Sequence, residues 1–546
     1  MVDRFANGDT NNDGDIALDD PAAFHGGDLQ GVIDHLDELK EMGVGTIWLS
    51  PIFAMRTEKF FGHGAFHGYW VEDFTRVEPR FGDEALLTRL SDELHRRGMK
   101  LVLDIVLNHV AMDSPRVREQ PNWFHGKGPL KDWSDPVQLT THDVHGLPDL
   151  DQSKPAVYDH LLSTSLKWIA LARPDGFRLD AVKHIGNDFW ARYNGAILEA
   201  TSPDFMLLGE VLDGDPRQIA QTQRDGKFNA MFDFPLYFSL IDVFCRGQSP
   251  AKLGAVFSSD RIYDRPETLV TLLDNHDLPR VVSDCGGDLD KVRQALTFQL
   301  TSRGTPAINY GTEAALEGAK EPENRADMRF ETQPLRPHIE KLMRLRATHT
   351  ALKTGAPMLL FASQDRLIYA RVDAREVAVI AVNASDAAHN FAFPEALTKA
   401  RLVDALSGAE LAPGAIHLKP RSTSLFILTP NTSAGFADLA ATAHAQWKHG
   451  TRQREVRFQA EGLKLKKGDE AFIVGSGLEV GVWKPENGLG PLDRHGRLSA
   501  RLPVASAYEL KLVIRAKNGE VRWAEGANTA LFVPEGDAPL DVTLSW

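Results

Sequence analysis

Three acidic residues follow apolar, strand-like segments of the chain. Asp180 lies in GFRLDAVKH, Glu210 ends FMLLGE, and Asp277 ends ETLVTLLDNHD. The carboxyl ends of parallel strands meet at one edge of a sheet, so we expect these three carboxylates to converge. Cleavage of a glycosidic bond with retention needs such a set, because one carboxylate attacks the sugar while a second carboxylic acid protonates the leaving oxygen.

The residue types suggest separate roles for two of these acids. If the strand is regular, Arg178 lies on the same face as Asp180, and its guanidinium favours the ionised carboxylate of a nucleophile. Glu210 ends an apolar strand, where partial desolvation raises a carboxyl pKa and keeps the group protonated as a general acid. Any one of these acids alone would more simply be a paired or capped group at a strand end. Their joint occurrence favours catalysis.

Apolar β-rich segments alternate with amphipathic segments over the first 345 residues. The predicted strands are 44–50, 99–109, 175–182, 205–211, 267–277 and 305–311. Between them, DEALLTRLSDELHRRG at 83–98 is typical of a helix that stops at Gly98. Strands that are buried on both faces and alternate with helices predict a parallel sheet, and at this length an α/β fold of the closed (β/α)8 TIM-barrel type is favoured over an open sheet.

Changes of pattern divide the 546 residues into domains. An insert rich in Trp, His, Pro and Asp interrupts the alternation at the barrel rim, where such insertions usually build substrate surface. Short strands with turns then predict a small all-β domain, a linker with room for a short helix, and a second β module. The predicted boundaries are 1–109 and 156–345 for the barrel, 110–155 for the insert, 346–429 for the first β domain, 430–451 for the linker and 452–546 for the last module.

Composition excludes several classes of partner. The chain holds 61 Lys and Arg against 75 Asp and Glu, and its net charge of −14 argues against nucleic acid, which is bound by cations that neutralise phosphates. No segment approaches the roughly 18 apolar residues of a membrane span. Cys245 and Cys285 provide no disulfide framework; a single pair could bridge, but we expect two unpaired thiols. We also expect this chain to carry no signal peptide, as in a mature or truncated form.

The motifs DIVLNH, GFRLDAVKH, LLGEV and LLDNHD occur in the order and spacing of the α-amylase family, glycoside hydrolase family 13. LPDL at 147–150 resembles the family's motif in its inserted domain. The chain is similar to the branch of maltogenic amylases and cyclodextrin glucanotransferases. This resemblance implies a barrel (domain A) with an inserted domain B and a C-terminal β-sandwich domain C. Only Met1 and Val2 precede the DRF segment that normally follows the first strand, so we expect the natural chain to extend upstream.

The resemblance also assigns residues to the catalytic centre. It implies that Asp180 is the nucleophile, Glu210 the acid/base and Asp277 the carboxylate that holds sugar hydroxyls and favours a distorted, oxocarbenium-like ring. Within HGYW at 67–70, Tyr69 would stack under the sugar at the cleavage point; an isolated aromatic is otherwise more often part of a core. The implied substrate-binding residues are His67, Tyr69, His109, Arg178, Lys183, His276 and Arg325.

Two calcium (Ca2+) sites are implied by the same resemblance. NGDTNNDGD at 7–15 with GGD at 26–28 resembles the N-terminal calcium loop of cyclodextrin glucanotransferases, and its oxygen-rich set suits a cation that takes six to eight oxygen ligands. The alternative is an ordinary Asn/Asp-rich turn. The implied ligands are Asn7, Asp9, Asn12, Asp13, Gly26 through its carbonyl, and Asp28. A second site would join Asn108, Asp149 and His184, which could instead be ordinary hydrogen-bonding residues.

The last module resembles the starch-binding module of carbohydrate-binding family 20. The matching features are GVW at 481–483, Lys511, and VRWAEGAN with Trp523 and Asn528. By this resemblance Trp483 and Trp523 stack on successive glucoses, while Lys511 and Asn528 bond hydroxyls. The alternative is that both tryptophans belong to the core of a small sandwich.

Two departures from the cyclising enzymes favour hydrolysis over transfer. His145 stands where those enzymes carry a Tyr or Phe around which the glucan wraps, and Leu212 stands where Phe is frequent. Without these aromatics, water should compete better against a sugar acceptor. The interval before residue 452 is also too short for the extra β domain of the cyclising enzymes.

We therefore expect a secreted, calcium-binding, retaining α-1,4-glucan hydrolase that acts as a monomer on starch and maltooligosaccharides, with no nucleic-acid or membrane partner. One alternative is a glucanotransferase that forms cyclodextrins or transfer products, for which Lys183 matches a family acceptor-side residue. A second alternative is a carbohydrate-binding protein that has lost catalysis.

Overall fold

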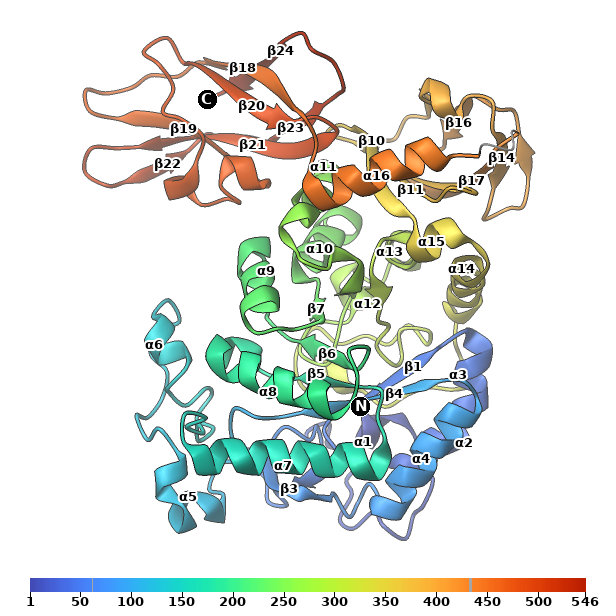
Figure 1. The fold of residues 1–546 in the computed structure, drawn as a ribbon, viewed down its shortest axis with the longest axis vertical. Helices are drawn as coiled ribbons and strands as arrows, with labels where there is room; N and C mark the ends of the chain where they lie inside the picture. Colours follow the sequence, from blue (N-terminus) through green and yellow to red (C-terminus); the bar gives the residue numbers. More distant parts are fainter. Residues whose placement is uncertain (61, 432–434) are drawn as a thin grey trace. The chain divides into compact units, whose positions relative to one another are not determined.

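A computed structural model describes residues 1–60, 62–431 and 435–546 (Figure 1). These residues divide into two units, which are described separately. Unit 1 comprises Met1–Phe234, Thr268–Leu289 and Thr305–Met343, and unit 2 comprises Pro235–Glu267, Asp290–Gly304 and Arg344–Trp546.

A curled parallel sheet forms the core of unit 1. Its strands, in spatial order, are β1 (Thr46–Leu49), β4 (Lys100–Ile105), β5 (Gly176–Leu179), β6 (Met206–Gly209), β7 (Ala230–Phe232), β8 (Leu269–Thr271) and β9 (Thr305–Pro306). All six predicted strand segments are present. The structure adds β7, whose three residues are all buried. Residues Val2–Phe5, at the start of the chain, form the short helix α1. The sheet confirms the predicted barrel architecture.

Helices alternate with these strands and begin at capping residues that are visible in the sequence. The helix α4 (Glu84–Arg96) starts after Asp83, whose side chain accepts from the backbone N–H of Leu86, and it buries leucines at helical spacing. The predicted helix at 83–98 is therefore confirmed. Other helices that lie wholly in unit 1 are α2 (Leu29–Asp34), α3 (Leu36–Met42), α7 (Pro155–Ala172), α8 (Asn187–Ala200), α9 (Pro216–Asp225) and α12 (Val281–Asp284).

The inserted segment between β4 and α7 contains little regular structure. It carries the short helices α5 (Pro115–Glu119) and α6 (Pro136–Leu139), drawn in cyan in Figure 1. An antiparallel bridge between His109 and Asp149 ties the end of the segment back to the end of β4. Before β4, the chain forms an antiparallel hairpin of β2 (Phe53–Met55) and β3 (Val71–Val77).

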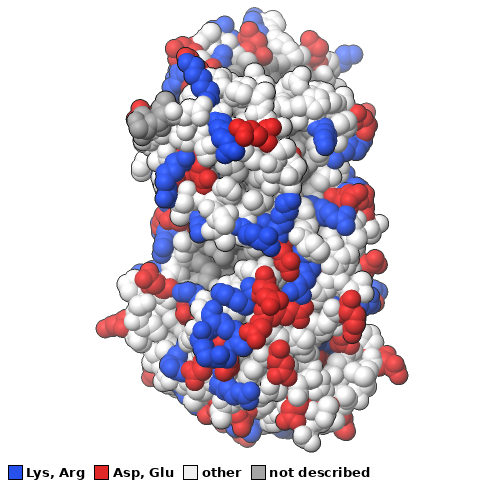
Figure 2. All heavy atoms as spheres, turned by 90° about the vertical axis from the view of Figure 1, so that its right-hand side faces the viewer, with Lys and Arg blue, Asp and Glu red and all other residues white. Residues whose placement is uncertain are grey.

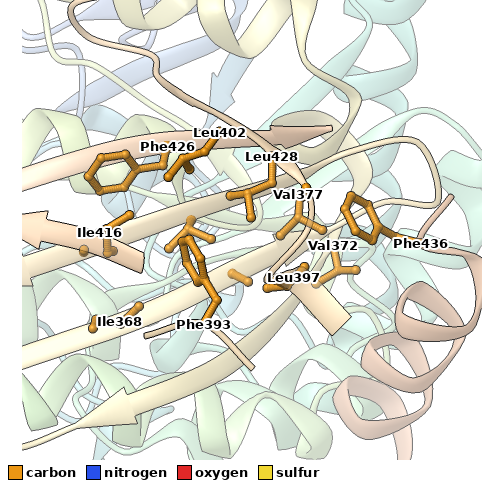
Figure 3. Close-up of a cluster of buried hydrophobic side chains, with 14 of the residues drawn as sticks. Ile368, Val372, Val377, Phe393, Leu397, Leu402, Ile416, Phe426, Leu428 and Phe436 are labelled. Atoms are coloured by element: carbon orange, nitrogen blue, oxygen red, sulfur yellow. The ribbon is translucent and has the colours of Figure 1, made fainter. Parts of the chain in front are cut away.

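The first β domain of unit 2 is an antiparallel sheet. Its strands, in spatial order, are β10 (Ala356–Ala362), β11 (Arg366–Val372), β12 (Val377–Asn383), β17 (Ser422–Thr429), β14 (Arg401–Asp404) and β15 (Glu410–Leu411), and a separate pair is formed by β13 (His389–Ala392) and β16 (Ala415–Leu418). Every residue of β12 is buried, which shows that both faces of this strand are covered. Figure 3 shows the apolar core, in which Phe393 and Phe426 lie among aliphatic side chains.

The last β module has its own core of buried side chains, which includes Val456, Ile473 and Tyr508. It follows the helix α16 (Ala437–His449), which lies in the predicted linker. Its strands are β18 (Gln453–Glu461), β19 (Glu470–Gly475), β20 (Arg497–Pro503), β21 (Ser506–Arg515), β22 (Val521–Trp523), β23 (Thr529–Val533) and β24 (Leu540–Ser545). The change to β-structure after residue 350 is thus confirmed. Further helices that lie wholly in unit 2 are α11 (Ala251–Ser259) and α15 (Thr350–Thr354). The helices α10 (Phe234–Leu240) and α13 (Leu289–Thr301) begin with the last residue of a unit 1 segment and continue in unit 2, and α14 (Arg336–Thr348) likewise spans both units.

The cysteines correct one prediction. Cys245 and Cys285 are buried and disulfide-bonded, so the expected pair of unpaired thiols is wrong. Pairing depends on proximity in the fold, which spacing along the sequence does not reveal.

The helices and the surface charge both bear on possible partners. No helix in residues 1–60, 62–431 and 435–546 is long and apolar enough to cross a membrane. On the face shown in Figure 2, basic and acidic side chains are intermixed.

Candidate active site

A buried arginine connects the predicted catalytic acids. Arg178 lies on β5 with its side chain fully buried. Its Nη1 donates to Asp180 Oδ1 at 2.6 Å and to Asp104 Oδ1 at 3.0 Å, while its Nη2 lies 2.6 Å from Glu210 Oε1. Because Asp180 and Glu210 contact the two terminal nitrogens of one planar guanidinium, their carboxyls are adjacent. Adjacent carboxyls are the arrangement that a retaining glycosidase needs.

The strand register explains why these acids meet. Leu179 on β5 pairs with Gly209 on β6, so Asp180 and Glu210 follow directly at the same level of the sheet. Ala181 then adopts a left-handed conformation with φ 51°, which turns the chain away from the strand. Its backbone N–H donates to Glu210 Oε2 at 3.1 Å and fixes the second oxygen of that carboxylate.

The carboxyls of this cluster are buried, and they outnumber the basic groups that contact them. Burial raises the pKa of Asp180 and the pKa of Glu210, and the guanidinium of Arg178 opposes both shifts. Burial likewise raises the pKa of Asp104 to about 7. As expected, the Arg178 guanidinium lowers the pKa of Asp180, but desolvation outweighs one cation shared by three carboxylates, so the net shift is upward. For Glu210, the upward shift favours the protonated form that a general acid requires.

Asp277 behaves differently from the other two acids. Its Oδ2 lies 3.0 Å from His276 Nε2, and its Oδ1 accepts from Arg325 Nη2 at 3.1 Å. Although burial favours the protonated form, His276 and Arg325 hold the pKa of Asp277 below its usual range. Its negative charge also raises the pKa of both Asp180 and Glu210. Asp277 is therefore an ionised acceptor beside two carboxyls that hold protons more strongly.

Tyr69 provides an aromatic surface beside the acids. Its hydroxyl donates to Asp104 Oδ2 at 2.7 Å, and its ring stacks on His276 with centroids 4.9 Å apart and planes inclined by 11°. The ring of His67 also stacks on that of Tyr69, with centroids 5.8 Å apart. His109 Nε2 lies 3.1 Å from the backbone oxygen of Tyr69. Burial lowers the pKa of His67 far below its usual value and that of His109 to about 4, so both imidazoles are neutral near pH 7. These rings frame a site for a neutral sugar.

Two residues of this network were missed in the sequence. Asp104 pairs in register with Arg178 across β4 and β5, and it also accepts from Trp48 Nε1 at 3.0 Å. The available signal was an acid within the otherwise apolar segment MKLVLDIVL. Trp48, in TIWL of β1, carried no signal that distinguishes it from a core aromatic.

Lys183 lies outside this buried network. Its ammonium contacts Asp213 Oδ2 at 3.3 Å, and its side chain is 37% exposed. Both residues lie in the loops that follow the strands carrying Asp180 and Glu210, which places the pair at the rim of the site.

The N-terminal loop gathers the oxygen-bearing residues predicted for the first calcium site. The buried Asp28 caps α2 and accepts from the backbone N–H groups of Gly8 and Asp9. Asn12 donates to Asp28 through Nδ2, while its Oδ1 is buried without a hydrogen-bond partner. Asn7 Nδ2 donates to Asp13 Oδ1 at 2.8 Å beside Gly26, where an added Cβ would lie within 2.8 Å of both side chains. An unpartnered buried oxygen in such a loop fits a hard cation.

The second predicted calcium site also brings acceptors together. One end of the Asn108 amide lies 3.3 Å from Asp149 Oδ1 and 3.0 Å from the backbone oxygen of His184. His184 thus contributes its carbonyl, while its Nδ1 lies 3.0 Å from the backbone oxygen of Leu139. In the described part of the chain, no group of three or more His, Cys, Asp or Glu side chains is arranged to hold a metal ion. This second site instead combines one carboxylate with amide and carbonyl oxygens, which are ligands that suit calcium.

The predicted starch-binding residues lie together in the last β module. The rings of Trp483 and Trp523 have centroids 6.4 Å apart and planes inclined by 41°, and Trp523 is 41% exposed. Lys511 Nζ donates to the backbone oxygen of Gly526, and Asn528 Nδ2 donates to Glu509 Oε2 at 3.4 Å. The exposure of the Trp523 ring on β22 argues against the alternative that both tryptophans belong to the core.

Comparison with known proteins identifies both parts of the chain. Residues 1–341 match the family model described as the alpha amylase catalytic domain, and residues 453–543 match the model of a starch-binding domain. The chain belongs to the α-amylase family. A cyclomaltodextrinase from a Bacillus species is 31% identical over 423 residues, which cover 71% of this chain and 72% of that protein. These matches confirm a glycoside hydrolase, and the amylase family together with the starch-binding domain implies starch and maltooligosaccharides as substrates.

Solved structures of the α-amylase family resemble this chain. The crystal structure of an Anoxybacillus α-amylase has a TM-score of 0.75 and 36% identity, and the match covers 79% of this chain and 97% of that one. The γ-cyclodextrin glucanotransferase of Bacillus clarkii matches 100% of this chain and 98% of its own, with a TM-score of 0.72. At 24% identity, the second likeness shows the fold alone.

Proposed function

We propose that this α-amylase family chain is a retaining α-1,4-glucan hydrolase that releases maltooligosaccharides from starch. The observation that carries the proposal is the shared contact of Arg178 with Asp180 and Glu210 at 2.6 Å each. This contact holds a nucleophile and an acid side by side at the ends of neighbouring strands.

In the first step, Asp180 attacks the anomeric carbon while Glu210 protonates the leaving glycosidic oxygen. In the second step, Glu210 takes a proton from water, and that water displaces Asp180 from the anomeric carbon. Arg178 remains bound to both carboxyls throughout, so its positive charge offsets the negative charge that moves between them. Because the anomeric carbon is inverted twice, the product keeps the α configuration.

A second group of residues binds the sugar ring that becomes attached. We call it the donor pocket, and it consists of Tyr69, His276, Asp277 and Arg325. The ring of Tyr69 offers a flat face to the C–H face of a pyranose, while ionised Asp277 accepts from hydroxyls and stabilises positive charge on the oxocarbenium-like ring. The neutral His276 bonds hydroxyls of the same ring.

Two other functions remain as alternatives. A glucanotransferase would use the same covalent intermediate and a sugar in place of water, and the fold is shared with a cyclodextrin glucanotransferase. A carbohydrate-binding protein without catalysis would not need the conjunction of Asp180, Glu210 and Asp277 around buried cations. Hydrolysis is favoured over cyclisation because His145 and Leu212 replace the aromatics of cyclising enzymes.

Incubation of the full chain with soluble starch tests the proposal. Reducing ends should appear, and proton NMR at early times should show α-anomeric products. Predominantly cyclic products would favour the glucanotransferase, and an initial β anomer would refute the retaining mechanism. Complete absence of reducing ends with calcium present would favour the binding protein.

We further propose that calcium binds at both oxygen-rich sites. The unpartnered Asn12 Oδ1 supports the N-terminal site, and the convergence of Asn108, Asp149 Oδ1 and the His184 carbonyl supports the second. Calcium bound at the second site would tie the inserted segment to the ends of β4 and β5 and offset the buried charge of Asp149. Isothermal titration calorimetry, with calcium added to the chain after a chelator has removed bound metal, would measure the number of calcium sites.

We also propose that the enzyme is an extracellular monomer. Support comes from the disulfide-bonded cysteines, because such bonds are typical of secreted proteins and other oxidising compartments. Starch-degrading activity in the culture medium, compared with washed cells, tests the location. Size-exclusion chromatography tests the oligomeric state.

A further inference from the structure

A cavity of about 800 Å³ lies in unit 1, apart from the candidate active site. We call it the side cavity, and Met55, Glu72, Arg80 and Arg116 are among the residues that line it. Its walls come from the hairpin of β2 and β3, the loop before α2 and the helix α5 of the inserted segment (Figure 1). None of the described residues that line it is a catalytic acid or a member of the donor pocket. Cavities of about 300–1,000 Å³ are typical of sites for small organic ligands.

Two arginines of the side cavity carry donors without a partner. The buried Nη2 of Arg80 and the buried Nε of Arg116 form no hydrogen bond within the described part of the chain. The rest of the Arg80 side chain is fixed, because its Nε donates to Glu78 Oε1 at 2.6 Å and its Cζ lies 3.4 Å from the ring centroid of Phe24. A buried donor costs free energy until an acceptor reaches it. Both arginines therefore favour a ligand that carries oxygen acceptors.

Arg116 and Glu72 line the side cavity as unpaired charges. Neither side chain forms an ion pair with any residue that the structure describes. Arg116 Nη1 donates to Gln120 Oε1 at 3.4 Å, and its Cζ lies 5.4 Å from the ring centroid of Trp123. Burial, and then the charge of Glu58, raises the pKa of Glu72. A guanidinium that donates and a carboxylate that accepts can both bond hydroxyl groups, which donate and accept in turn.

The charge of the side cavity favours a neutral ligand. Four basic and five acidic residues line it, so an anion would meet the carboxylates and a cation would meet the bases. Some of these charges already neutralise each other, as in the contact of Arg76 with Asp73 at 2.9 Å. Apolar surface comes from Met55 and Pro115, which suits the C–H faces of a pyranose. The lining thus matches a neutral sugar with many hydroxyls.

We propose that the side cavity is a second glucan-binding site in the catalytic unit, which holds a short maltooligosaccharide or the end of a starch chain. The guanidinium groups of Arg80 and Arg116 donate to sugar oxygens, and Glu72 accepts from hydroxyls. The inference rests on the proposed action on starch and adds a sugar site that the catalytic acids do not reach. A polymer held there stays near the chain after each cleavage, because binding at one site raises the effective concentration of the polymer at the others.

Tryptophans provide a separate reporter for each sugar site. Trp123 lies next to Arg116, Trp48 lies in the candidate active site, and Trp523 lies in the last β module. The full chain is labelled with 5-fluorotryptophan and titrated with maltotriose, with Asp180→Asn present so that the sugar stays intact. Fluorine NMR follows each ring, and single Trp→Phe variants assign the signals. We expect the Trp123 signal to shift along a saturation curve of its own.

Variants of the lining test whether that curve reports the side cavity. We expect Arg116→Ala to weaken the binding reported by Trp123 about tenfold, because a charged donor to the sugar is lost, and to leave the other two curves unchanged. Glu72→Gln keeps the size of the side chain and should weaken the same binding about threefold. The matched control is Arg118→Ala, which removes an exposed arginine of α5 that does not line the cavity and should leave all three curves unchanged.

Several results would overturn the inference. They are a Trp123 signal that maltotriose does not move, a Trp123 curve that is unchanged in Arg116→Ala, and an equal loss of binding in Arg118→Ala. A Trp123 signal moved by inorganic phosphate and not by maltotriose would also overturn it, since the cavity would then select anions. Each of these results leaves hydrolysis of starch by the parent chain untouched. Failure of the parent chain to release reducing ends would instead refute the proposed function, whatever the Trp123 signal shows.

Discussion

The catalytic cluster and the starch-binding surface handle the same kind of ligand with opposite physical means. In the catalytic cluster, Arg178 and Asp104 are completely buried, and their charges are arranged before substrate enters. In the last β module, Trp523 is 41% exposed, and its ring centroid lies 6.4 Å from that of Trp483. Bond cleavage needs desolvated charge, because low local dielectric strengthens every interaction with the transition state. Adsorption to a polymer needs only accessible flat rings.

The strongest way to separate the two regions is to remove the nucleophile. We expect Asp180→Asn to lower kcat on soluble starch by at least about 10⁴-fold, as when other enzymes lose the group that forms their covalent intermediate. Adsorption to starch granules should stay at the parental level, which a depletion assay would measure. The control Asp204→Asn changes an exposed residue before β6 and should keep full activity. Parental activity in Asp180→Asn would contradict the assignment of roles.

The converse experiment removes the two tryptophan rings of the last β module and should impair adsorption while leaving hydrolysis intact. We expect the double variant Trp483→Ala and Trp523→Ala to weaken adsorption to granules about 100-fold, since each ring contributes roughly one decade of affinity. Hydrolysis of maltotetraose should be unaffected. Val521→Ala, which removes an exposed apolar side chain from the same strand, is the control and should adsorb normally. If Val521→Ala lost as much adsorption as the double variant, general surface hydrophobicity and not ring stacking would explain binding.

The pH dependence of the two regions should differ as well. Activity requires ionised Asp180 and protonated Glu210, and burial raises the pKa of both. Activity should therefore fall about tenfold per pH unit on the acid side, where Asp180 gains a proton, and on the alkaline side, where Glu210 loses one. Adsorption by uncharged rings should change little over the same range. Measurement of kcat/KM and of granule adsorption from about pH 4 to about pH 9 would show this, and parallel profiles would contradict it.

Calcium should stabilise only the catalytic unit. We expect calcium to raise the melting temperature of the parent chain by about 2–4 °C per kcal/mol of binding free energy, and the rise to be smaller in Asn12→Ala. The control Asn11→Ala changes a neighbouring exposed residue and should respond like the parent chain. Chelation should leave granule adsorption unchanged. Equal calcium responses in all three chains would show that Asn12 binds no cation.

Much of the fold follows from local patterns in the sequence. Apolar strand segments and amphipathic helices predicted the parallel sheet, and the acids at the strand ends predicted which edge would carry chemistry. Asp180 and Glu210 converge because strand direction and register are set by the same hydrophobic pattern that buries β5 and β6. The strand β7 escaped prediction because a short apolar run such as AMF at 230–232 does not distinguish a buried strand from part of a buried helix.

Only the tertiary structure decided how the site works around those acids. It placed Asp104 opposite Arg178, buried Asp180 so that desolvation outweighs Arg178 in setting its pKa, and paired Cys245 with Cys285. The sequence by itself determined the order of strands and the residue types at their ends, since hydrophobic periodicity is a local property. Desolvation, shared cations and ring contacts depend on residues far apart in the chain, so they are decided when the strands and the insert pack together.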